Sequence, residues 1–188
     1  MKLIRMVGFG IITAVAAAAL AAGGNASSAS LDDMTLRESD LPAGFDQVFS
    51  HRLPRAEMIE IQGAVTSGYR GGWQREFTRA QGVDSALVTS SVLKYATADD
   101  AHRAVRRSWR HIVDHAGAKR LLVGRPLGHE ARAIAYQTTG GITAYAVVWR
   151  YKNVNGSVLV VGLKSLGVTL DLATRLAVRQ QRHIRLEV

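Results

Sequence analysis

The chain has 188 residues, a formal net charge of +9 and no cysteine. A chain without cysteine has no disulfides, thiol catalysis, iron–sulfur clusters or cysteine-based zinc sites. Its length suffices for one domain that folds without covalent cross-links. The excess of Lys and Arg favours a partner of negative charge, although a GC-rich genome also enriches Arg without any such selection.

The first 29 residues have the pattern of a secretory signal peptide. Lys2 and Arg5 precede an uncharged run at 6–24, and small residues follow at 25–30. A basic start, an apolar run and a small-residue cleavage zone are typical of exported proteins. We therefore predict a secreted or extracytoplasmic protein.

We expect cleavage after Ser28 or Ala29, so that residues 1–29 form the signal peptide and residues 30–188 a single domain. The alternative is an N-terminal membrane anchor that is not cleaved, because the uncharged run approaches the roughly 20 residues that span a bilayer. Ala and Gly dominate this run and no charged stop follows it, which favours cleavage over anchoring.

The first half of the domain is predicted to begin with a turn and to continue mainly as strands. Pro42 restricts φ and Gly44 permits positive φ, so residues 40–45 are predicted to form the turn. Alternating apolar and polar residues predict strands at 45–51, 73–79 and 86–95, with a short helix at 55–62.

A longer helix is predicted to begin after Thr97. Threonine is a favourable N-cap, and Asp99 and Asp100 complement the positive end of the helix dipole. Apolar residues then recur every three or four positions until Gly117, where we expect the helix to end.

The second half of the domain is predicted to contain strands at 131–138, 142–152 and 157–163 and a closing helix at 169–185. The strand at 142–152 is apolar on both faces and is predicted to be central. Asn155-Gly156 favours the two-residue turn of a β-hairpin, because both residues tolerate positive φ. This order of elements predicts an α+β fold, with a largely antiparallel β-sheet packed against two main helices.

Four short segments carry a resemblance to a known group of proteins. They are D-L-P-A-G-F at 40–45, Gly72-Trp73, T-A-D-D-A at 97–101 and L-G-H-E-A at 127–131. In these segments the chain resembles secreted bacterial α+β domain proteins of unknown function that open with D-L-P-x-G-F. The resemblance implies export and no particular catalytic residues. The arrangement is also similar to PsbP-like sandwich domains, by analogy of fold only.

His111 and His115 are weak candidates for a metal site, because they lie one helical turn apart. His102 or Glu130 could supply a third ligand, but the intervening Asp114 is shorter than the Glu of zinc enzymes with this spacing. Imidazoles near the end of a helix also complement its dipole. We favour this second interpretation and predict no metal and no cofactor.

Arginines form a row on each main helix, away from its apolar stripe. If both helices cover the same face of the sheet, the rows merge into one anion-binding surface; otherwise they are ordinary solvated residues. The candidates are Arg103, Arg106, Arg107 and Arg110 on the first helix and Arg175, Arg179 and Arg182 on the last.

Aromatic residues predicted on neighbouring strands could line an apolar pocket, although such stripes are more often part of the core. The candidates are Trp73, Phe77, Tyr145, Trp149 and Tyr151.

The sequence therefore favours an exported, non-enzymatic binding domain of the bacterial cell envelope or extracellular space. An anionic envelope polymer or lipid headgroups are the expected partners. Nucleic acid is disfavoured, because no exposed aromatic residue is clearly interleaved with the arginines. The alternative function is a secreted hydrolase, with or without a metal.

Overall fold

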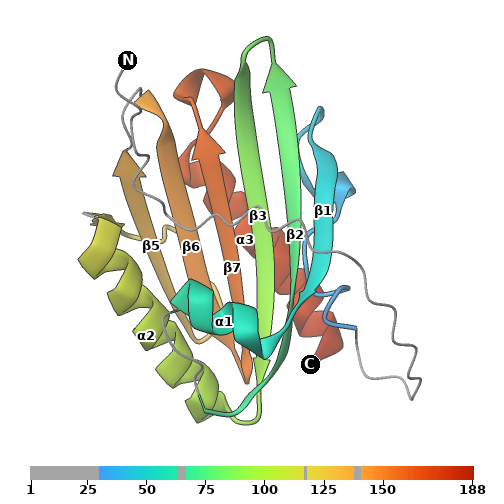
Figure 1. The fold of residues 1–188 in the computed structure, drawn as a ribbon, viewed down its shortest axis with the longest axis vertical. Helices are drawn as coiled ribbons and strands as arrows, with labels where there is room; N and C mark the ends of the chain where they lie inside the picture. The colour runs from blue at the N-terminus through green and yellow to red at the C-terminus, as the bar shows by residue number, and fades with distance from the viewer. Residues whose placement is uncertain (1–29, 63–66, 117, 138–140) are drawn as a thin grey trace.

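The computed structural model describes residues 30–62, 67–116, 118–137 and 141–188. The predicted signal peptide, residues 1–29, lies outside the described residues. The described residues form one seven-stranded sheet and three α-helices (Figure 1). The strands are β1 (Asp46–Leu53), β2 (Tyr69–Gln81), β3 (Asp84–Tyr95), β4 (Lys119–Leu121), β5 (Glu130–Gln137), β6 (Thr143–Tyr151) and β7 (Val154–Gly162). The helices are α1 (Arg55–Gln62), α2 (Ala98–Ala116) and α3 (Leu170–Glu187).

The sheet is antiparallel throughout, with the strand order β1-β2-β3-β7-β6-β5-β4. Strands β1 to β3 follow one another along the chain, and so do β4 to β7. The two sets meet where β3 pairs with β7, with Ser90 opposite Val158. The predicted α+β fold with a largely antiparallel sheet and two main helices is confirmed.

The larger core lies between α3 and one face of the sheet. Val147 of β6 and Val158 of β7 are register partners, and both have no exposed surface. They belong to the same cluster as Leu172, Leu176 and Ile184, which form the apolar stripe of α3. Burying this stripe against the sheet holds α3 in place.

The helix α2 covers the opposite face. Trp109 of α2 packs with Ile134 of β5 and Ala146 of β6 in a separate cluster. Successive side chains of a strand point to opposite faces, so Ala146 and its neighbour Val147 assign α2 and α3 to different sides. Figure 1 shows this arrangement, with α3 behind the sheet and α2 in front of it.

The hairpin between β6 and β7 is confirmed, but the prediction of its turn is wrong. The turn lies at Lys152-Asn153, where Lys152 has a φ of 52°. Asn155-Gly156 lies inside β7 instead, with Gly156 opposite Trp149. The large indole ring occupies the space beside Gly156, so the glycine serves close packing rather than a turn.

Candidate functional site

An open groove of about 570 Å³ lies between the end of β2 and the start of α3. In Figure 1 this is the upper end of the molecule, where the β2–β3 hairpin stands beside the segment that joins β7 to α3. The groove is lined by Pro42, Gly44, Arg79, Ala80, Gln81, Ser165, Leu166, Gly167, Leu172 and Arg175. Its volume is within the range of small-molecule sites.

Arg79 is a fixed cation of this groove. It lies near the end of β2, and its guanidinium donates a hydrogen bond to the carbonyl oxygen of Leu166. The guanidinium carbon also lies 4.9 Å from the centroid of the Phe45 ring, a cation–π contact. The Nε atom is buried without a hydrogen-bond partner in the described structure. These contacts orient the charge before any ligand arrives.

Arg175 supplies a second, more adaptable cation. It follows the first turn of α3, which Thr169 caps by accepting a hydrogen bond from the backbone N–H of Leu172. Arg175 lies 2.8 Å from the carboxylate of Asp171, and both side chains are more than half exposed. An ion pair this exposed is weak, so Arg175 can exchange Asp171 for a ligand at little cost.

No carboxylate is among the residues that line the groove, whereas Leu166, Leu172 and Pro42 give it an apolar part. Arginine binds carboxylate and phosphate groups through two parallel hydrogen bonds. The groove can therefore hold a ligand that combines an anionic head with an apolar body.

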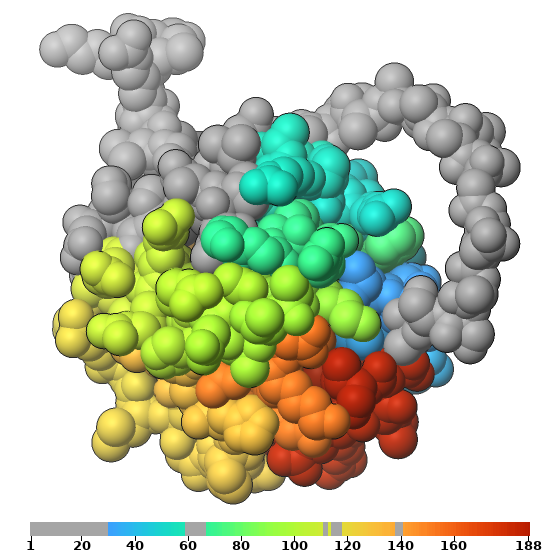
Figure 2. Space-filling model, turned by 90° about the horizontal axis from the view of Figure 1, so that it is seen from below, coloured from blue at the N-terminus to red at the C-terminus, as the bar shows by residue number. Residues whose placement is uncertain are grey.

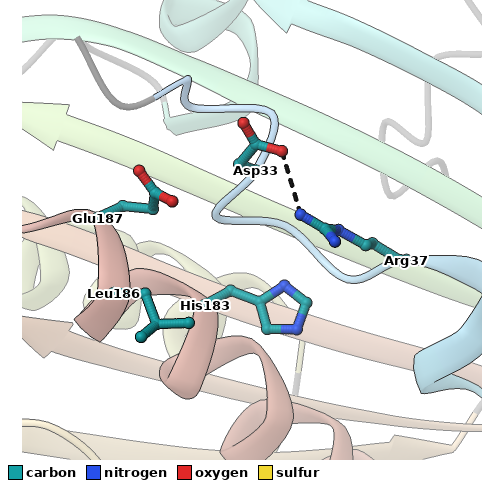
Figure 3. Close-up of a pocket in the computed structure, with 5 residues that line it drawn as sticks. All are labelled: Asp33, Arg37, His183, Leu186 and Glu187. Carbon is teal, nitrogen blue, oxygen red and sulfur yellow. Dashed lines mark hydrogen bonds and ion pairs between the residues drawn. The ribbon is translucent and has the colours of Figure 1, made fainter. Parts of the chain in front are cut away.

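A second, much smaller cavity of about 90 Å³ lies between α3 and the segment that precedes β1 (Figure 3). His183, Leu186 and Glu187 approach it from α3, and Asp33 and Arg37 face them as an ion pair of 3.2 Å. The cavity is small for an organic ligand.

The surroundings of this cavity join the N-terminal segment to the sheet. The Nδ1 atom of His183 lies 3.1 Å from the carbonyl oxygen of Thr35. Arg75 of β2 donates a 3.1 Å hydrogen bond to the carbonyl oxygen of Leu36 and forms an ion pair with Asp32. These contacts fix the N-terminal segment to α3 and β2, so they need no ligand to explain them. The groove is therefore the better candidate site.

The predicted histidine pair falls partly outside what the structure describes. His111 and His115 belong to α2, but their side chains are outside the described residues. His102 and Glu130, the suggested third ligands, contact each other instead, with 2.7 Å between Nδ1 and the carboxylate. Among the described residues no group of three or more His, Asp or Glu side chains is placed to hold a metal ion.

Glu130 is also bound by Arg150 of β6, whose Nε donates a 2.8 Å hydrogen bond to the same carboxylate oxygen. Burial alone would raise the pKa of Glu130. The hydrogen bonds and positive charges of His102 and Arg150 together outweigh burial and hold this pKa below its usual value. The carboxylate is thus kept ionised at the edge of α2.

The two arginine rows do not form one surface, and that prediction is wrong. Arg103, Arg106, Arg107 and Arg110 lie on α2, whereas Arg175, Arg179 and Arg182 lie on α3, across the sheet. Four of these arginines have partners within the protein. Arg103 pairs with Asp100 at 2.7 Å and Arg175 with Asp171 at 2.8 Å, whereas Arg110 and Arg179 donate to the carbonyl oxygens of Arg106 and Asp40. Anion binding by either row alone stays a prediction.

The five aromatic candidates belong to the core beneath α3. Phe77 and Trp149 have no exposed surface, and the other three are partly buried against the same cluster. None of Trp73, Phe77, Tyr145, Trp149 and Tyr151 lines the groove or the smaller cavity. The structure thus accounts for the stripe as packing.

Sequence reasoning missed Arg79 as a site residue. A signal was present, because Arg75 and Arg79 alternate with Trp73 and Phe77 and so share the inward face of β2. A charged arginine on an otherwise apolar face is costly unless it has a partner, so its presence there is a signal of a specific role.

Comparisons with known proteins identify the fold but no family. A scan against models of protein families and a search of curated proteins gave no match. Among solved structures, the chain is similar to the extracellular domain of PknH from Mycobacterium tuberculosis. The TM-score is 0.64 at 14% sequence identity, over 86% of this chain and 98% of that one. At this identity the likeness shows a shared fold.

Proposed function

We propose that the protein is an extracytoplasmic binding domain that holds a small anionic ligand in the groove between β2 and α3. The observation that carries this proposal is the charge of the groove. Its lining includes the two cations Arg79 and Arg175 and no carboxylate, within a volume of about 570 Å³. A ligand with a phosphate or carboxylate head and a short apolar body fits both parts of this lining.

The two arginines of the groove have different roles in the proposed binding. Arg79 is oriented by Leu166 and Phe45, so it contributes a charge that loses little freedom on binding. Arg175 is exposed and leaves a weak ion pair to meet the ligand. Leu166 and Leu172 then cover the apolar body.

The binding test compares hexyl phosphate with hexanol by calorimetry. We expect hexyl phosphate to bind and hexanol to bind far more weakly, with an affinity for the phosphate that falls as salt rises. Arg175→Gln should weaken hexyl phosphate binding roughly tenfold, since it removes a charge-assisted hydrogen bond. Arg182→Gln, an exposed substitution on the same helix outside the groove lining, is the matched control.

Equal affinity of the two ligands, or of the two variants, would contradict this site. The same samples also test the alternative function. Release of inorganic phosphate from hexyl phosphate would indicate a secreted hydrolase, whereas a binding domain leaves the ligand intact.

Export is the second part of the proposal. The signal-like pattern of residues 1–29 supports it, and so does a fold shared with the extracellular domain of a PknH protein. No helix among the described residues is long and apolar enough to cross a membrane. We expect mass spectrometry of the secreted protein to find a chain that begins at Ala29 or Ser30. A membrane-bound chain that retains Met1 would instead show an anchor.

A further inference from the structure

A basic surface lies on the α2 side of the sheet, at the edge formed by β4 and β5. We define this basic face by Arg106, Arg110, Arg120 and Arg132, together with Leu122. We propose that the basic face docks on an anionic lipid bilayer, with Leu122 entering the interface. This proposal does not depend on the groove, which lies between β2 and α3.

Helix geometry brings the two arginines of α2 to the β5 side of that helix. His102, Arg106 and Arg110 are spaced four residues apart, so they form a line along one side of α2. His102 contacts Glu130 at the start of β5, 2.7 Å away. The line of arginines therefore runs along the strand that Glu130 begins.

A second contact ties Arg132 to the same place. Arg132 is two residues beyond Glu130 and so lies on the same face of β5. Its guanidinium carbon lies 5.5 Å from the centroid of the Trp109 ring, and Trp109 precedes Arg110 in α2. Arg132 is thus held between the strand and the helix, next to the arginine line.

Strand pairing adds Arg120. Its register partner on β5 is Ile134, which packs under α2 with Trp109. Paired residues of neighbouring strands share a face of the sheet, so Arg120 lies on the α2 side. Arg106, Arg110 and Arg120 are all exposed.

Leu122 stands on this face as well. Leu122 directly follows β4, and its neighbours Leu121 and Val123 both pack against the core beneath α3. We therefore infer that the exposed side chain between them turns to the other side. The Leu122 side chain is 91% exposed. Figure 2 views the molecule from below, where α2 (lime) and residues of the segment that follows it (yellow) lie side by side on the surface.

An exposed leucine among arginines favours a bilayer over a soluble polyanion. Both partners offer anionic groups, but only a bilayer offers hydrocarbon to an apolar side chain. Glu130, the carboxylate at the start of β5, does not offer a free negative charge to this face, because it is already bound by His102 and Arg150.

The other strongly exposed apolar residues lack this setting. Val83 precedes Asp84 at the tip of the β2–β3 hairpin. Leu186 follows the exposed Arg185 on α3, but it shares the lining of the small cavity with the carboxylates of Asp33 and Glu187. An anionic surface would repel these carboxylates. The combination of several arginines with an exposed leucine therefore selects the basic face.

The test is cosedimentation of the protein in its secreted form with vesicles of phosphatidylcholine, with and without phosphatidylglycerol. We expect binding to the anionic vesicles that falls with salt. Arg106→Glu with Arg110→Glu should lower the partition coefficient at least roughly 25-fold, since each basic residue near an anionic surface is worth roughly fivefold. Leu122→Ser should lower it roughly tenfold while leaving the salt dependence unchanged.

Two variants on α3 control for general charge and for general surface hydrophobicity. Arg182→Glu reverses an exposed arginine of α3, and Leu186→Ser removes an exposed leucine there; both should bind vesicles as the unaltered chain does. The proposal is overturned if these controls lose as much binding as the test variants. It is also overturned if Leu122→Ser has no effect and polyphosphate or DNA competes fully, which would assign the basic face to a soluble polyanion.

Discussion

Gly156→Ala is expected to lower the free energy of unfolding by about 3 kcal/mol, at the upper end of the usual cost of overpacking. A Cβ atom at this position would lie 2.4 Å from Cζ2 and 2.6 Å from Cε2 of Trp149. Trp149 has no exposed surface, so its ring cannot move aside without displacing the core beneath α3. The melting temperature should fall by roughly 10 °C for a domain of this size.

Chemical denaturation measures this effect, and Gly124→Ala is the matched control. A Cβ at Gly124 would meet no atom within 4 Å, so its cost should stay within about 0.5 kcal/mol. A smaller ring should relieve the clash, so Trp149→Phe should cost less in the Gly156→Ala background than in the unaltered chain. If the costs of Gly156→Ala and Trp149→Phe simply add in the double variant, the clash between the new Cβ and the indole ring is not the cause of the destabilisation.

Glu130→Gln is expected to destabilise the protein by about 2 kcal/mol at neutral pH, since it removes charge-assisted hydrogen bonds at a largely buried carboxylate. The Glu130 side chain is 18% exposed and that of Arg150 is 17% exposed. Removing the carboxylate's charge leaves Arg150 partly buried with a weaker partner, which is the larger part of the cost.

The sign of the pH dependence follows from the lowered pKa of Glu130. A carboxyl whose pKa is lower in the folded state stabilises the fold above its unfolded-state pKa, which is about 4.3 for Glu. This contribution is lost as the pH falls through the folded-state pKa. The stability difference between the unaltered chain and Glu130→Gln should thus be full near pH 7 and should shrink under acid conditions.

Thermal unfolding across this pH range, with the exposed Glu38→Gln as control, provides the measurement. A difference that stays constant from neutral to acid pH would mean that the charge of Glu130 does not stabilise the fold.

The helices and strands could be predicted from the sequence because the interactions that start and stop them involve residues close together in the chain. The helix at 55–62 coincides with α1, and Thr97 caps α2 by accepting a 3.1 Å hydrogen bond from the N–H of Asp100. Both depend on neighbours within a few residues, where capping and periodicity decide the structure.

The side of the sheet that each helix covers is not a local property. The apolar stripes of α2 and α3 show that each helix packs on something, but the face that each helix meets is defined only by contacts with distant strands in the folded sheet. The turn at Lys152-Asn153 has the same explanation, because the turn preference of Asn155-Gly156 is overridden by a ring that lies nearby only in the folded sheet.

The candidate site was harder still to predict. Arg175 could be named from its row on the helix, but the groove also needs Arg79 from β2 and Leu166 from the segment before α3. These residues are far apart in the chain and meet only through the tertiary fold.

The junction of β3 with β7 also bears on how the protein reaches its native state. Every other pairing in the sheet joins strands that are consecutive in the chain, whereas this one closes a loop of about 60 to 75 residues. Such closure is slow. The N-terminal half is synthesised first, so β3 remains an open edge, with Val88 and Val92 on its apolar face, until β7 has been made. Newly made copies of the chain are thus most prone to pair with one another through β3 during this interval.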